Sequence, residues 1–289
     1  MSSWQKIGLK IGAFIAASAV LSTALNLLLP RFLLHPVRLD ADYIFSFEQP
    51  FEEFFLPSPD GAQINALYFC TASPARKGAV LYFHGNADNL QRWGGFASDF
   101  TRRGYDFFVM DYRSFGKSTG TFSEENCYAD ARLAHSWLLQ KGLQPNQIVL
   151  CGRSLGSGIA SQLATQVTAK MLLLETPYDN LRSVAVAHAP FIWWEKNFPF
   201  RFQNDENLQK INIPVHIFHG NADRIIPYRC AANLKKYLKK SDSFNTILGG
   251  QHKNLNTFEE YQTKLDAILE TNNPLPFQNE PLHDNSNKH

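Results

Sequence analysis

The sequence predicts an α/β fold in which a mostly parallel, doubly wound sheet is covered by helices on both faces. Short β-rich runs alternate with helical segments, and this alternation implies right-handed crossovers between parallel strands. Several runs are apolar at consecutive positions, as expected for strands buried on both faces. The 289 residues, 44% of them hydrophobic, suffice for one sizeable core.

The predicted strands begin with a hairpin. Two apolar runs within residues 51–69 flank the turn cluster PSPDG at residues 57–61. Six further runs follow at wide spacing: AVLYFH (79–84), DFFVMDY (106–112), QIVLC (147–151), AKMLLLE (169–175), PVHIFH (214–219) and FNTIL (244–248). These six runs are expected to form the parallel part of the sheet.

Helical segments are expected between the strands, at residues 89–103, 124–141, 229–240 and 254–270. The second of these has the clearest end signals. Ser123 is its expected N-cap, acidic residues occupy the first turn, and Lys141-Gly142 ends it. Asp88 is expected to cap the first of these helices.

The motif order favours a single domain over residues 39–272. A hydrophobic segment and linker, residues 1–38, precede it. The tail, residues 273–289, is rich in Pro and Asn and is expected to be disordered.

Residues 11–30 contain no charged side chain, and about 20 apolar residues are enough to span a bilayer as a helix. We therefore expect a single-pass N-terminal membrane anchor. A cleaved signal peptide and a soluble helix remain alternatives. Lys6 and Lys10 precede the segment and Arg31 and Arg38 follow it, so the charges do not orient it across the membrane.

The charge balance, 28 Lys and Arg against 26 Asp and Glu, does not predict the basic surface of a nucleic-acid binder. The four cysteines are far apart and match neither a zinc site nor a disulfide framework. The nine histidines show no metal-ligand spacing. No cofactor, metal or nucleic-acid partner is therefore expected.

The strongest functional signal is Gly152-Arg153-Ser154-Leu155-Gly156, a G-x-S-x-G motif between a predicted strand and a helix of small residues. A nucleophilic serine needs a sharp turn, and the glycines leave room for it. The helix N-terminus then places N–H groups and a positive dipole end near a developing oxyanion. The alternative is that Ser154 is an ordinary turn serine.

A nucleophilic serine needs a base, and the base needs an acid that orients it. His252 follows the last predicted strand, at the strand end where active sites of open α/β sheets lie. Asp223 follows the strand before it and is the expected acid. Glu175 and Asp179 follow an earlier strand and are the alternatives.

The expected oxyanion donors are the backbone N–H of Leu155 and that of Asn86, with Ala87 as the alternative to Asn86. The loop that supplies Asn86 directly follows an apolar strand. His84, in the same loop, is expected to order the loop rather than act as a second base.

The segments YFHGNADN, DYRSFGKSTG, CGRSLGSG, FHGNADRIIP and GGQH resemble the α/β-hydrolase superfamily in the same order. They are most similar to membrane-anchored serine hydrolases of the Bem46-like and abhydrolase-domain 12, 13 and 17 group. The resemblance covers residues 40–270. It implies a triad of Ser154, Asp223 and His252 and an oxyanion hole after His84. Relatives often have glycine where this chain has Asp88 and Ser114.

These features predict a serine hydrolase that transfers an acyl group from a small-molecule, lipid or acylated-protein ester or thioester to water. A serine peptidase, an acyltransferase and a non-catalytic binding protein are the alternatives. A lid is expected over residues 176–211, with the aromatic residues Phe191, Trp193, Trp194 and Phe198. These aromatics are expected to line an acyl pocket, dip toward lipid or pack on the domain itself.

Overall fold

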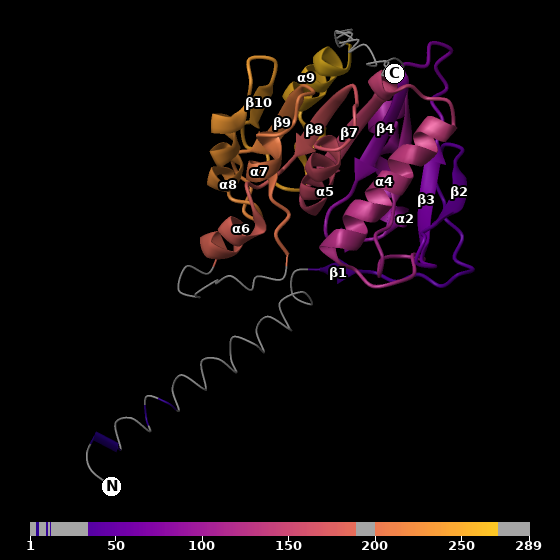
Figure 1. The fold of residues 1–289 in the computed structure, drawn as a ribbon. Helices are drawn as coiled ribbons and strands as arrows, with labels where there is room; N and C mark the ends of the chain where they lie inside the picture. The colour runs from indigo at the N-terminus through magenta and orange to yellow at the C-terminus, as the bar shows by residue number, and fades with distance from the viewer. Residues whose placement is uncertain (1–3, 6–9, 11, 13–33, 189–199, 271–289) are drawn as a thin grey trace, which may run out of the picture.

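The computed structural model describes residues 4–5, 10, 12, 34–188 and 200–270. Its centre is an eight-stranded sheet that Figure 1 shows running from β10, in orange, to β2, in indigo. The strands are β2 (Glu52–Pro57), β3 (Gln63–Phe69), β4 (Gly78–Phe83), β6 (Tyr105–Met110), β7 (Ile148–Arg153), β8 (Met171–Glu175), β9 (Val215–Gly220) and β10 (Ser243–Ile247). The predicted α/β architecture is confirmed.

The strand order is β10-β9-β8-β7-β4-β6-β3-β2. Pairing is parallel from β10 to β6, and β3 is antiparallel to both β6 and β2. The chain leaves β4 toward β6 on one side and returns to β7 on the other. The carboxyl ends of β4 and β7 therefore flank a topological switch point, where open α/β sheets bind their ligands.

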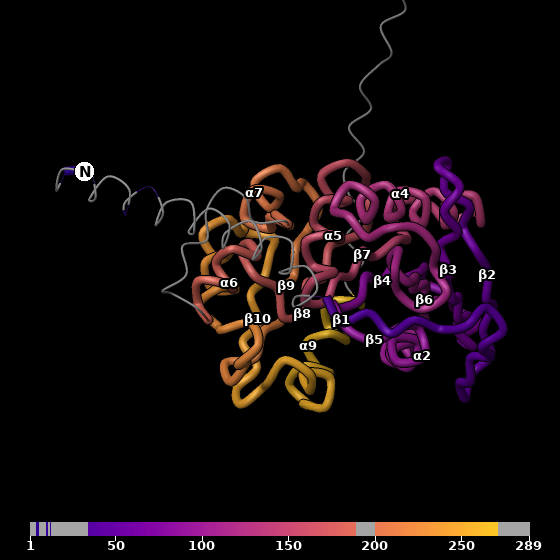
Figure 2. Tube along the Cα trace, turned by 90° about the horizontal axis from the view of Figure 1, so that it is seen from below, coloured from indigo at the N-terminus to yellow at the C-terminus, as the bar shows by residue number. Residues whose placement is uncertain are grey.

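The sheet separates two apolar cores, because successive strand residues point to opposite faces. Leu81 belongs to one core and Tyr82 to the other. Figure 2 shows α4, α5 and α7 on one side of the sheet and α2 and α9 on the other. The first face is covered by α4 (Glu124–Gln140), α5 (Leu155–Ala164), α7 (Asn204–Leu208) and α8 (Tyr228–Ala232). The second face is covered by α2 (Leu90–Trp93), α3 (Ala97–Thr101) and α9 (Glu259–Glu270).

The predicted helix at residues 89–103 is divided into α2 and α3 by a 3₁₀ turn, Gly94–Phe96. Glycine disfavours the α-helix by about 1 kcal/mol relative to alanine, and Gly94 and Gly95 stand together at this point.

The predicted helix at residues 229–240 is also shorter than expected. It consists of α8 and a 3₁₀ turn, Asn233–Tyr237. Continuing the helix would place Lys235 and Lys239 four residues apart on one face, and like charges at that spacing destabilise a helix. The last helix, α9, begins only after a 3₁₀ turn at Leu255–Thr257.

Helix caps differ between α4 and α2. Ser123 caps α4 as predicted, because its hydroxyl accepts the N–H of Asn126 at 3.1 Å. The prediction that Asp88 caps α2 was wrong: the Asn89 side chain accepts the N–H of Gln91 at 2.9 Å. An N-cap needs extended backbone, which Asn89 has, whereas Asp88 has a φ of 67°.

Two short strands, β1 (His35–Pro36) and β5 (Ala87–Asp88), pair in parallel beside the main sheet. The N–H of His35 donates to the Asn86 carbonyl at 2.9 Å, and the N–H of Val37 donates to the Asp88 carbonyl at 3.3 Å. The chain that follows residues 11–30 is thereby attached to the loop after β4.

Most of the predicted membrane segment, residues 11–30, and all of the tail, residues 273–289, lie outside the described residues. Within the part of the chain that is described, no helix is both long and apolar enough to cross a membrane. The cysteines are free thiols, three of them buried and Cys70 exposed.

Candidate active site

Ser154 lies at the turn between β7 and α5, with φ 53° and ψ −117°. Serine rarely adopts a positive φ, and strained backbone of this kind is concentrated at functional sites. A Cβ atom on Gly152 would collide with the Gly156 carbonyl, and one on Gly156 would collide with the Phe83 carbonyl of β4. The G-x-S-x-G spacing is therefore needed for the close approach of β7, α5 and β4.

Three predicted site residues meet at the carboxyl ends of their strands. His252 Nε2 is 3.1 Å from Ser154 Oγ, and His252 Nδ1 is 2.8 Å from Asp223 Oδ2. Ser154 follows β7, Asp223 follows β9 and His252 follows β10. Ser154 and Asp223 are buried, and the His252 side chain is 13% exposed. This is the arrangement that a serine, a base and an orienting acid require.

The surroundings of Asp223 favour its charged form. Burial opposes ionisation, but the hydrogen bond and the charge of His252 outweigh burial, so the pKa of Asp223 lies below its ordinary value. The N–H groups of Ile225 and Ile226 also donate to Asp223 Oδ1, each at 2.8 Å. An ionised Asp223 accepts from Nδ1 of His252, which leaves Nε2 free to accept the Ser154 proton.

His219 lies behind this pair, with its Nε2 3.7 Å from Asp223 Oδ2. Burial lowers the pKa of His219, and Asp223 only partly opposes that effect. His219 is therefore neutral at pH 7, and His252 faces Asp223 without a competing imidazolium.

The predicted oxyanion donors line the same cavity as Ser154. Asn86 follows β4, and Leu155 is the first residue of α5. The first N–H groups of a helix have no partner within the helix, so the N–H of Leu155 suits an anionic oxygen. The Asn86 carbonyl accepts from His35 N–H, which fixes the loop that carries the second N–H.

His84 takes no part in this group. Its ring is buried, with Nδ1 2.7 Å from the Gly85 carbonyl and Nε2 3.3 Å from Asp111 Oδ1. The His84 carbonyl accepts the Tyr112 hydroxyl at 2.7 Å. These contacts order the loop from within the core.

The two alternative acids, Glu175 and Asp179, have other partners. Glu175 is buried beside Arg153, 3.4 Å away, and accepts the hydroxyl of Tyr261. Asp179 accepts from Asn233 at 2.8 Å. Among the three candidate acids, Asp223 is the one that is hydrogen-bonded to the His252 ring.

A cavity of about 220 Å³ opens beside Ser154. Besides the site residues, its described lining is mostly apolar: Leu34, His35, Tyr178, Leu181, Val184, His188, Phe200, Ile225 and Ile226. The predicted lid aromatics Phe191, Trp193, Trp194 and Phe198 lie outside the described residues. Helix α6 (Leu181–His188) was not predicted, although its apolar residues Leu181 and Val184 recur at helical spacing.

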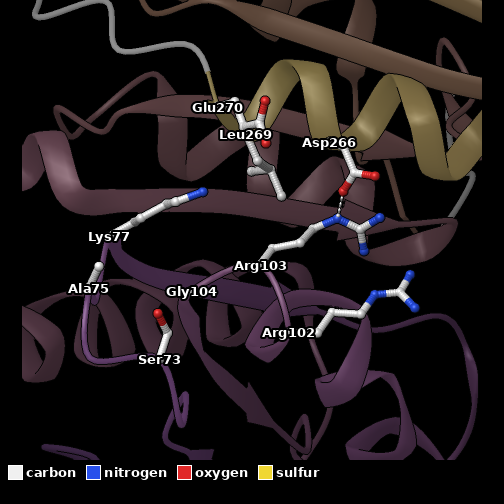
Figure 3. A pocket seen from close by; sticks show the side chains of 9 residues that line it. All are labelled: Ser73, Ala75, Lys77, Arg102, Arg103, Gly104, Asp266, Leu269 and Glu270. Atoms are coloured by element: carbon white, nitrogen blue, oxygen red, sulfur yellow. Dashed lines mark hydrogen bonds and ion pairs between the residues drawn. The ribbon is translucent and has the colours of Figure 1, made fainter.

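A second pocket, of about 290 Å³, lies at the opposite edge of the sheet. Lys77 and Gly104 line it, and they directly precede β4 and β6. Figure 3 shows Arg103 paired with Asp266, at 2.5 Å. This ion pair partly neutralises the charge of the pocket. The pocket lies far from the carboxyl ends of the strands, where Ser154 is located. In the described ranges no group of three or more His, Cys, Asp or Glu side chains is placed to hold a metal.

Comparison with known proteins identifies the fold that carries this geometry. The α/β hydrolase GrgF from Penicillium superposes with a TM-score of 0.60; it is 14% identical, and the match covers 76% of this chain and 96% of GrgF. The chain has the α/β-hydrolase fold. The Pyrococcus furiosus esterase Pf2001 is similar to it with a TM-score of 0.63 and 17% identity, over 82% of this chain and 96% of that one.

Relatives in sequence agree with the predicted resemblance. The chain is 27% identical to human alpha/beta hydrolase domain-containing protein 17B, over 80% of each chain. It is 30% identical to the lysophosphatidylserine lipase ABHD12 of Danio rerio, over 57% of this chain and 48% of that protein. It thus spans about half the length of ABHD12. A family model described as serine aminopeptidase, S33, matches residues 74–204.

Proposed function

We propose that this protein is a serine hydrolase of the α/β-hydrolase superfamily that cleaves carboxylic esters or thioesters through an acyl-Ser154 intermediate. The observation that carries the proposal is the hydrogen-bonded series from Ser154 through His252 to Asp223, at 3.1 and 2.8 Å, beside an apolar cavity.

The proposed reaction has two halves. His252 Nε2 takes the Ser154 proton while Oγ attacks the acyl carbonyl, and the N–H groups of Asn86 and Leu155 bind the oxyanion. Collapse breaks the ester bond, and His252 returns the proton to the leaving alcohol or thiol. Water then loses a proton to His252 and attacks the acyl carbonyl. The acyl–Oγ bond breaks, the acid leaves, and His252 returns the proton to Ser154 Oγ. Asp223 holds the imidazole tautomer and stabilises the imidazolium.

The cavity favours an apolar acyl group as the substrate portion. Leu181, Val184 and Ile226 lie along its wall near Ser154. The names of the esterase and lipase relatives agree with lipid-like or acylated substrates.

A serine peptidase is the second candidate, because the matching family model is described as a serine aminopeptidase. An aminopeptidase must bind the substrate's α-ammonium group, for which a carboxylate is the natural partner. The described lining residues of the cavity include no Asp or Glu. This lining supports an ester substrate over a peptide.

We further propose that residues 11–30 hold the enzyme at a membrane. Leu34 and His35, which follow that segment closely, line the cavity beside Ser154. An anchor in this position would bring the opening of the cavity near the lipid surface.

A fluorophosphonate probe and p-nitrophenyl esters test the proposed function. Wild-type enzyme should be labelled and should hydrolyse the octanoate ester faster than the acetate ester. Ser154→Ala should lose labelling and at least about a thousandfold of the activity, and Asp223→Asn should lose a similar factor. Equal labelling of wild type and Ser154→Ala would refute the nucleophile. Faster cleavage of aminoacyl p-nitroanilides than of esters would favour the peptidase.

A further inference from the structure

We propose that Arg153 is a positioning residue that holds His252 in reach of Ser154, and that Glu175 is the counter-ion of Arg153. The proposal rests on the proposed function, because it assigns a role within the same site. Arg153 is the first variable residue of the G-x-S-x-G motif, so one dipeptide carries both the nucleophile and the group that holds its base.

The Arg153 side chain is 4% exposed and reaches across the site. Its Nη2 donates to the backbone carbonyl of His252 at 2.9 Å, and its Nη1 lies 3.4 Å from Glu175 Oε2. The guanidinium also lies over the Phe96 ring, 5.0 Å from the ring centroid. A planar group that stacks and donates in two directions is held in one orientation.

Glu175 compensates the buried positive charge of Arg153. Arg153 and Glu175 are neighbours in the register of β7 and β8, and both are the last residues of their strands. Tyr261 donates its hydroxyl to the other Glu175 oxygen. Burial raises the pKa of Glu175 and Arg153 opposes that effect. A buried ion pair adds little to stability compared with apolar packing, so its presence here calls for another role.

His252 needs such support because it lies in a loop between β10 and α9. The Gly250 carbonyl in this loop accepts the N–H of Ala222 at 3.0 Å, which ties the loops of the base and the acid together. The contact from Arg153 acts on His252 itself and connects it to the strand of the nucleophile. Because both ring nitrogens of His252 already have partners, a small backbone displacement would break the contact with Ser154 Oγ.

The test compares four variants: Arg153→Met, Arg153→Lys, Glu175→Gln and the double variant Arg153→Met/Glu175→Gln. For each, kcat and KM on a p-nitrophenyl ester, the rate constant of fluorophosphonate labelling and the melting temperature are measured. Arg113→Met is the matched control. Arg113 is also 4% exposed and pairs with the buried Asp130, at 2.8 Å, but has no contact with the triad.

Arg153→Met should lower kcat and the labelling rate on the order of 10- to 100-fold with little change in KM, because misplacing a catalytic group by about 1 Å has effects of that size. Arg153→Lys keeps one donor group, so its kcat and labelling rate should lie between those of Arg153→Met and wild type. The double variant leaves no lone buried charge, so its melting temperature should recover while kcat stays low. Arg113→Met should lower the melting temperature and leave kcat within about twofold of wild type.

A double variant whose kcat recovers along with its melting temperature would overturn the proposal, because the ion pair would then serve stability alone. So would an Arg113→Met variant that loses kcat as Arg153→Met does. These outcomes differ from failure of the proposed function, in which wild-type enzyme itself lacks Ser154-dependent ester hydrolysis.

Discussion

At the residue scale, the site depends on side chains that the chain places far apart and the sheet brings together. Ser154, Asp223 and His252 each follow a different strand, and the parallel pairing of β7 to β10 sets their carboxyl ends side by side. Because a parallel sheet aligns all its carboxyl ends, residues just after strands are the natural candidates for a shared site.

Buried histidines make the stability of the folded protein depend on pH. Burial lowers the pKa of His135 in α4 below its ordinary 6.5, opposed in part by a hydrogen bond that the His135 ring donates to the backbone of Thr168. Between 6.5 and the lower folded pKa, the unfolded chain binds more protons than the folded chain, so stability falls as pH falls. Relative to wild type, His135→Gln should therefore become more stable as pH drops from 8 to 5.5.

Urea unfolding of both proteins at the two pH values measures this difference. Comparing the two proteins cancels the contributions of other groups, such as Asp111, whose pKa burial raises. A difference in unfolding free energy that is the same at both pH values would contradict the prediction.

The candidate triad could be proposed from sequence because its signals are local: a strand, a glycine pair and a short loop. The contact of Arg153 with the His252 carbonyl could not, because it joins residues that only the completed sheet and loop bring together. The predicted cap of α2, Asp88, is one residue before the observed cap, Asn89. Asp and Asn are equally good caps in sequence, and only the backbone angles of the two residues distinguish them.

At the element scale, strands were easier to predict than helices. A buried parallel strand is an uninterrupted apolar run, and each of the six predicted runs overlaps a strand of the sheet. The helices on the surface depend on weaker signals. Gly94-Gly95 and the lysines after α8 interrupt helical geometry where the sequence pattern alone suggested continuation.

Among the helices, α4 carries the clearest local prediction. Replacing its N-cap, Ser123→Ala, removes the hydrogen bond to the N–H of Asn126 and should lower the unfolding free energy by about 1 kcal/mol. Chemical denaturation measures this change. Ser98→Ala, at an exposed position of α3, is the control and should change the free energy by less than about 0.5 kcal/mol. Equal effects of the two substitutions would exclude a special role for the cap.

At the scale of the whole molecule, deletions can test the proposed anchor, residues 11–30, apart from the described domain, which begins at residue 34. Deletion of residues 2–30 should move the protein from the membrane fraction to the soluble fraction and preserve fluorophosphonate labelling. Deletion of residues 2–39 also removes β1 and its bonds to Asn86 and Asp88, so labelling should decrease. Retention of the shorter deletion in the membrane fraction would show that other segments hold the enzyme there.

The pairing of β1 with β5 also determines how the molecule would carry mechanical load. Among the contiguous described residues that begin at Leu34, a pull from the N-terminal side first reaches the hydrogen bond between His35 N–H and the Asn86 carbonyl, before any strand of the large sheet. Two short strands offer little resistance to shear, so the loop that carries Asn86 would give way first. Given the proposed anchor and the proposed role of the Asn86 N–H, tension at this end would lower turnover while the sheet stayed folded.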